Sequence, residues 1–93
     1  MKFEWDEHKN KINQRKHGFN FVHAKNVFEN PMLTFLDTRI DHGEDRWVGI
    51  GIARGEIVTV VFTESIEQNI IRIISMRKAT NYERKKYNKS PRY

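Results

Sequence analysis

Side chains suited to binding phosphate are concentrated near the end of this sequence. Arg72, Arg77 and Lys78 lie within one short stretch, and Tyr87 follows soon after. A guanidinium group stays protonated and presents a planar fork of N–H donors that matches the geometry of phosphate. A phenol beside such cations can transfer a proton or stack on an unpaired base. We therefore predict that this stretch handles RNA phosphate.

A strand followed by a helix is predicted to position these residues. β-branched apolar residues fill most of a strand expected at Ile70–Ser75, and the cations that come next mark its end. Thr80 and Glu83 have the spacing of a capping box, so the last helix is expected to run from about Thr80 to Asn88. Glu83 is accordingly interpreted as structural first.

The first helix is expected to begin after Asp6, a favourable N-cap, and to run to about His17, with Gly18 as its C-terminal residue. A histidine at the C-terminus of a helix is favoured in its protonated form by the helix dipole. Three polar residues of this helix, at positions 9, 13 and 16, share one face. We expect that face to contact solvent or a ligand.

The middle of the chain consists of apolar runs separated by turn residues, which indicates strands joined by short antiparallel connections. The element order is (β)ααββββα, an α+β class in which a curled antiparallel sheet carries helices on one face. One domain is expected over residues 1–89, with a flexible tail at 90–93. Its other expected elements are an edge strand or arm at Lys2–Trp5, a helix at Phe21–Glu29, and strands at Met32–Asp37, Arg46–Ala53 and Ile57–Thr63.

Charge and composition narrow the class of partner. The net charge is +5, and residues 46–93 contain ten Lys or Arg but four Asp or Glu. Such clustering favours a polyanion partner, although a solvated basic tail gives the same pattern. There is no cysteine, and no two histidines are three or four residues apart, so no metal site or cofactor is expected. No apolar run is long enough for a membrane, and a cytoplasmic protein is expected.

Three motifs in sequence order resemble the BrnT family of toxins. WDEHKNKINQRKHGFNF is similar to W-D-x-x-K-x-x-x-N-x-x-K-H-G-x-x-F, with Phe19 where a small aliphatic residue is usual. GEDR matches G-E-x-R, and RIISMRKATNYERKKY matches R-I-I-S-A-R-K-A-x-x-x-E-R-x-x-Y, with Met76 in place of alanine. The resemblance spans residues 3–88, and the matched residues of the first two motifs are Trp5, Asp6, Lys9, Asn13, Lys16, His17, Gly18, Phe21, Gly43, Glu44 and Arg46.

The resemblance implies a fold, an activity and a partner. Members of the BrnT family are toxins of type II toxin–antitoxin modules with a RelE-like fold, and they cleave RNA without a metal ion. A BrnA-like ribbon-helix-helix antitoxin neutralises them, and the pair represses its own operon by binding operator DNA through the antitoxin. The resemblance further implies a 2:2 heterotetramer.

Metal-free cleavage requires a base for the ribose 2′-proton, cations that stabilise charge on phosphorus, and an acid for the leaving 5′-oxygen. Arg77 and Arg72 are the first candidates for the charge, and Arg46 is the third if its end of the sheet lies beside Arg77. Tyr87 is the candidate acid or stacking residue, and Glu44 is a possible base. His17 can act as acid or base, and the residues expected to bind RNA are Lys16, Lys78, Arg84 and Lys85.

Each assignment has a structural alternative. Arg72 can form an ion pair with Glu44 or Glu56 on a neighbouring strand, and Arg46 can form a cross-strand pair worth less than about 1 kcal/mol. The ring of Tyr87 can pack on the sheet, which is the usual fate of an aromatic residue at helical spacing. A binding module without chemistry is therefore the second interpretation. Direct DNA recognition is the weakest, because the sequence shows no DNA-binding motif.

Overall fold

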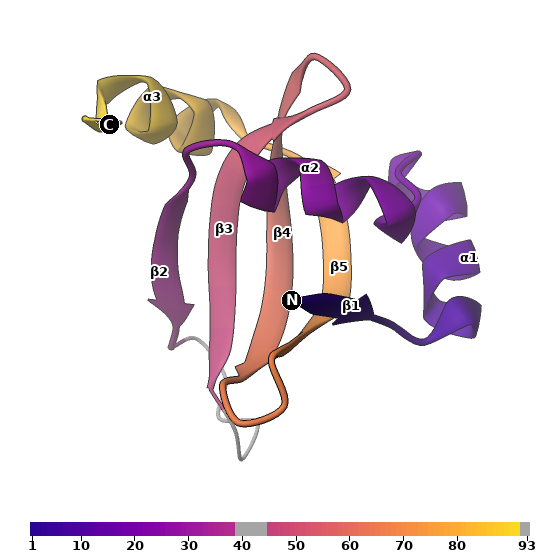
Figure 1. Ribbon diagram of the computed structural model, residues 1–93. Coiled ribbons are helices and arrows are strands. Elements are labelled where there is room, and N and C mark those ends of the chain that lie inside the picture. Colours follow the sequence, from indigo (N-terminus) through magenta and orange to yellow (C-terminus); the bar gives the residue numbers. More distant parts are fainter. Residues whose placement is uncertain (39–44, 92–93) are drawn as a thin grey trace.

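The computed structural model describes residues 1–38 and 45–91, in which five strands form one sheet (Figure 1). The strands lie in the order β1-β5-β4-β3-β2. Three α-helices and a short 3₁₀ turn accompany them within these residues. The α+β class and the element order are confirmed. The elements are β1 (Lys2–Glu4), α1 (Glu7–His17), η1 (Phe21–His23), α2 (Ala24–Glu29), β2 (Leu33–Asp37), β3 (Arg46–Ala53), β4 (Glu56–Ser65), β5 (Ile70–Lys78) and α3 (Asn81–Lys89).

The sheet is mixed, whereas the sequence indicated antiparallel pairing throughout. β2, β3, β4 and β5 pair antiparallel, but β1 runs parallel to the first residues of β5. Aromatic residues hold this N-terminal segment in place. Phe3 packs against Phe28 with ring centroids 5.3 Å apart, and Trp5 meets Phe21 edge-on at 6.3 Å. These contacts explain why the short segment is an edge strand and not a free arm.

The predicted helix boundaries of α1 are confirmed by its caps. The Asp6 carboxylate accepts a hydrogen bond from the backbone N–H of Lys9 at 3.2 Å, which also lowers the pKa of Asp6. Gly18 adopts φ 78°, a left-handed conformation that glycine reaches without a steric cost, and its N–H donates to the carbonyl of Gln14.

α2 crosses the middle of the sheet over β3 and β4 (Figure 1). Glycine in β3 allows this close approach, because a Cβ atom at Gly51 would lie 2.8 Å from Cγ1 of Val27. The main core lies between α2 and this face of the sheet, which we call the α2 face. Its buried residues are Phe19, Phe21, Ala24, Val27, Ala53, Val58, Val60, Phe62, Ile71, Ile73 and Met76.

α1 lies beside β5 and completes its open edge (Figure 1). β1 pairs with β5 only as far as Arg72, so the backbone of later β5 residues lacks a strand partner on that side. The Asn13 amide supplies one: Nδ2 donates to the carbonyl of Met76 at 2.9 Å, and Oδ1 accepts from the Met76 N–H at 3.2 Å. Asn13 is buried, so its predicted place on a solvent or ligand face is wrong.

α3 packs on the opposite face of the sheet, which we call the α3 face. Strand parity separates Val58 and Val60, which belong to the main core, from Thr59 between them. The Thr59 hydroxyl donates to the Glu83 carboxylate of α3 at 3.0 Å. The predicted capping box between Thr80 and Glu83 is present at the start of α3. The helices therefore cover both faces, not one as the sequence indicated.

Candidate functional site

The arginine residues predicted to converge lie at opposite ends of the sheet. Arg77 is opposite Thr59 near the end of β5, whereas Arg72 is opposite Thr63 near its start. At about 3.3 Å per residue, the two arginines are roughly 16 Å apart along the strand. Arg46 opens β3 opposite Asp37, at the Arg72 end. The predicted three-arginine cluster is therefore wrong, because antiparallel register places the start of β3 far from the end of β5.

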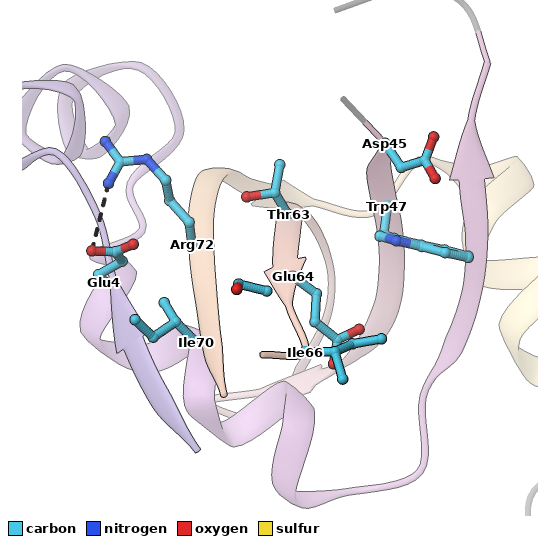
Figure 2. A pocket seen from close by; sticks show the side chains of 9 residues that line it. Glu4, Asp45, Trp47, Thr63, Glu64, Ile66, Ile70 and Arg72 are labelled. Carbon is cyan, nitrogen blue, oxygen red and sulfur yellow. Dashed lines mark ion pairs between the residues drawn. The ribbon is translucent and has the colours of Figure 1, made fainter. Parts of the chain in front are cut away.

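Arg72 lies in an acidic environment (Figure 2). It forms an ion pair with Glu4 at 3.9 Å, and it lines a depression of about 520 Å³ together with Asp45 and Glu64. Figure 2 shows Thr63 and Arg72 projecting from neighbouring strands to the same side of the sheet. The ion-pair interpretation of Arg72 is thus the one observed, with Glu4 as a partner, while Glu56 pairs with Lys78.

Of the other predicted catalytic residues, Tyr87 is taken up by a packing contact and Arg46 lies at the Arg72 end of the sheet. Tyr87 is 3% exposed, and its hydroxyl donates to the Pro31 carbonyl at 3.1 Å, so the packed-ring interpretation is the observed one. Glu44 lies outside the described residues. The Nε atom of Arg46 is buried and has no hydrogen-bond partner among the residues that the structure describes.

Arg77 is held by a carboxylate of α3. Its two terminal nitrogens contact the two Glu83 oxygens at 2.7 and 2.9 Å, a bidentate pair. Glu83 also accepts from Thr59 and from the backbone of Thr80. The hydrogen bonds from Arg77, with smaller contributions from those of Thr80 and Thr59, lower the pKa of Glu83 to about 2, although burial opposes this shift. The guanidinium fork is therefore occupied, but the Arg77 side chain remains 30% exposed.

Four basic side chains from three elements meet where β5 ends, and we call them the β5-end cluster. α1 contributes Lys16 and His17 at its C-terminus, β5 contributes Lys78, and the β3–β4 turn contributes Arg54. His17 lines two adjoining depressions, one of about 320 Å³ with Arg54 and Lys78 and one of about 220 Å³ with Lys16. Three of the residues predicted from sequence are thus brought together.

His17 is favoured in its neutral form. Its pKa is lowered from 6.5, first by burial and then by the positive charges of Lys16 and Arg77. The predicted preference for the protonated form is wrong, because burial and two neighbouring cations outweigh the dipole at the end of α1. A lowered pKa favours the proton-accepting form that a general base requires, in a depression lined by Arg54, Lys78 and Glu56.

Arg54 was missed by the reasoning from sequence. It adopts φ 54° and Gly55 adopts φ 76°, the paired left-handed conformations of a two-residue hairpin turn. The register of β3, β4 and β5 brings this turn to the end of β5. The Arg-Gly turn itself was recognisable, and pairing the two flanking strands with β5 would have placed Arg54 beside Lys78. Lys78 has an acidic neighbour too, in an ion pair with Glu56 at 4.0 Å.

A groove of about 420 Å³ lies between α3 and the α3 face, and we call it the α3 groove. Arg77 and Glu83 form one part of its wall, and Lys86 and Tyr82 of α3 form another. Of the other residues predicted to bind RNA, Lys85 is exposed on α3, and Arg84 donates hydrogen bonds to Ala79 and Asn81. Neither belongs to the β5-end cluster.

Two further properties concern the described ranges 1–38 and 45–91. None of their helices combines the length and apolar character needed to cross a membrane. Nor do three or more of their His, Asp or Glu side chains gather in a metal-binding arrangement.

Comparison with known families identifies the chain. A search of curated proteins finds no match. A family model described as "Ribonuclease toxin, BrnT, of type II toxin-antitoxin system" matches residues 5–83, which is most of the chain. The matched range contains α1, the whole of β5 and the capping box of α3. It includes all four residues of the β5-end cluster, and the chain belongs to the BrnT family of type II ribonuclease toxins.

Proposed function

We propose that this protein is a metal-independent endoribonuclease whose reaction takes place at the β5-end cluster. The observation that carries the proposal is the position of His17, which lines one depression with Arg54 and Lys78 and a second with Lys16. The family match supports ribonuclease activity as such. The cluster supplies a base and several cations without a metal ion.

In the proposed reaction His17 accepts the proton of a ribose 2′-hydroxyl. The 2′-oxygen forms a bond to phosphorus, and the bond from phosphorus to the 5′-oxygen breaks. An ammonium group, from Lys16 or Lys78, protonates the leaving oxygen, so one proton is taken and one is given. The products are a 2′,3′-cyclic phosphate and a 5′-hydroxyl. Arg77 contributes through its charge near His17, whereas Arg72 and Arg46 take no part.

The family match also supports an antitoxin partner. We infer, from the resemblance of the three motifs, that this partner is a BrnA-like ribbon-helix-helix protein. A dimer of it would hold two toxin chains and bind operator DNA in a cytoplasmic complex.

A binding module without chemistry is the second candidate function. Two observations favour it: the fork of Arg77 is closed by Glu83, and Lys78 is paired with Glu56. In this interpretation the basic surface holds RNA or the antitoxin, and His17 contributes nothing beyond contact.

The first prediction separates the two functions. Purified protein is incubated with end-labelled RNA, with and without EDTA, beside His17→Gln and the matched control His8→Gln. His8 is an exposed histidine in the first turn of α1, away from the β5-end cluster. We expect cleavage that EDTA leaves intact, a loss of about a hundredfold or more in His17→Gln, and none in His8→Gln. Retarded but uncut RNA would support the binding module, and equal activity of both variants would point to a contaminating nuclease.

A further inference from the structure

Tyr82, Phe35 and Lys86 form an aromatic and cationic patch at the α3 groove. Tyr82 is 71% exposed and Phe35 37% exposed, so both rings are accessible to a ligand in this groove. The Nζ atom of Lys86 lies 5.3 Å from the centroid of the Phe35 ring and 5.6 Å from that of Tyr82. One ammonium group thus bridges α3 and the edge strand β2 through two cation–π contacts.

The Tyr82 ring projects from a firmly held part of the molecule. It lies in the first turn of α3, between Thr80 and Glu83 of the capping box. Glu83 is in turn anchored to the sheet by Arg77 and Thr59. An exposed ring on a fixed backbone loses little conformational freedom when a flat ligand stacks on it, so it is suited to binding.

The chemistry of the groove indicates which flat ligand fits. Val48, Ile50 and Val61 line it with apolar surface, and Lys86 adds a positive charge beside the exposed ring. Unpaired bases of single-stranded nucleic acid stack on aromatic rings, while cations beside those rings attract the backbone phosphates. A protein segment would also use the apolar surface, but it would not need a cation held against an open ring.

Arg77 connects this groove to the β5-end cluster. It lines the α3 groove, and it directly precedes Lys78 of the cluster in β5. We propose that Tyr82, supported by Lys86 and Phe35, forms a subsite that stacks an unpaired base of the RNA whose phosphate binds at the β5-end cluster. The inference rests on the proposed function for its substrate, but its own test needs no cleavage.

The test uses a single-stranded RNA that is 2′-O-methylated at every position, so that it cannot react, and that carries 2-aminopurine as a fluorescent base. Stacking on Tyr82 quenches this fluorescence. The variants are Tyr82→Ala, which removes the ring, Tyr82→Phe, which keeps it, and Lys86→Gln, which removes the charge. Because Tyr82 is exposed, these chains are expected to keep the wild-type urea midpoint, which is measured as a control.

We expect Tyr82→Ala to weaken binding about tenfold and to abolish quenching, while Tyr82→Phe retains both. Lys86→Gln should reduce affinity and its dependence on salt. Wild-type affinity and quenching in Tyr82→Ala would overturn the proposal. Unchanged RNA binding together with lost binding of the co-expressed antitoxin would overturn it in favour of a protein-docking groove.

The same assay separates this inference from the proposed function. Quenching of the methylated RNA by the wild type and its loss in Tyr82→Ala report the stacking subsite, whereas cutting of ordinary RNA by the wild type reports the catalysis. A wild-type protein that quenches through Tyr82 but cuts no RNA would contradict the proposed catalysis and support the stacking subsite.

Discussion

At the scale of single residues, the protonation state of His17 decides whether the proposed chemistry can run at neutral pH. Burial and positive neighbours disfavour the imidazolium form, so the folded protein binds fewer protons at this residue than the unfolded chain does. The contribution of His17 to the free energy of unfolding is therefore fully present above pH 6.5. It is lost as the pH drops below that value. The rate of the proposed cleavage should fall over the same pH range, since protonation of His17 removes the proton acceptor.

The charge of Lys16 provides a direct test of this explanation. Lys16→Gln removes a positive neighbour of His17, so the pKa of His17 should rise towards its usual value. Proton NMR titration of the imidazole ring measures the change, and Lys11→Gln on the same helix is the matched control. A lowered or unchanged pKa in Lys16→Gln would show that burial alone sets the protonation state. The acid limb of RNA cleavage should move upwards together with the NMR value.

Residues whose roles depend on near neighbours could be predicted from the sequence. The helix caps are examples, because each of their hydrogen bonds joins residues no more than four positions apart. They are formed by Asp6, by Gly18 and by the pair Thr80 and Glu83. Asn13 and Arg54 could not be placed in this way, because their partners lie on strands far along the chain. The same reason explains the error about His17: the largest cause of its lowered pKa is burial, which is not visible locally, although its neighbour Lys16 is.

At the scale of elements, the junction between β5 and α3 depends on one carboxylate. Glu83 closes the capping box of α3 and binds Arg77 and Thr59 of the sheet. Its pKa is about 2 in the folded protein and 4.5 ordinarily. Because the folded value is depressed, the stabilisation is complete above about pH 4.5 and is lost as the pH falls through about 2.

Glu83→Gln should therefore lower the free energy of unfolding by about 2 kcal/mol at pH 7, since hydrogen bonds to a charged group are lost. The difference from the wild type should shrink steadily below about pH 4.5, because the unfolded wild-type chain then takes up a proton at Glu83, whereas the folded protein keeps this carboxylate ionised down to about pH 2. Urea unfolding between pH 7 and pH 3 measures the free energy of unfolding of the wild type and of Glu83→Gln. The control is Glu67→Gln, a change at an exposed loop residue. A difference that stays constant with pH would contradict the role of the charge.

Element types and order followed from the sequence, but faces and register did not. Local patterns located β3 at its observed bounds and the other elements to within a few residues. They did not show that β5 continues through Arg77 and Lys78, because the cations after Ser75 mimic the end of a strand. Nor did they show which face α3 covers, since that depends on the contact between Glu83 and Thr59, which are 24 residues apart.

At the scale of the whole molecule, α1 and β5 join the two ends of the chain. Asn13 and Met76 are 63 residues apart and exchange two hydrogen bonds, so a side chain takes the place of a missing strand. The edge of β5 is thereby protected from pairing with another chain. The β5-end cluster depends on this contact, because it fixes the C-terminal end of α1, with His17, against Lys78.

Asn13→Ala should lower the free energy of unfolding by roughly 2–4 kcal/mol, because the N–H and carbonyl of Met76 lose their buried partners. Urea unfolding measures the loss, with Gln14→Ala on the same helix as control. Hydrogen exchange of the Met76 amide should become faster than that of amides in the middle of β4. Retained protection at Met76 would show that packing of α1 alone closes this edge.

The dispersal of the arginines is a property of the whole sheet. Their spacing in sequence suggested one cluster, but antiparallel register places Arg46 and Arg72 at the end opposite Arg77. The charge imbalance between the two halves of the chain was visible from sequence, whereas its distribution over the folded surface required the strand pairing.

The two hydrogen bonds between Asn13 and Met76 have a consequence for synthesis of the protein. Lys16 and His17 are synthesised long before Lys78 and the strand that carries it. A chain made only as far as β4 therefore has the proposed base but no surface on which to assemble the proposed centre. That centre can form only after β5 has been synthesised.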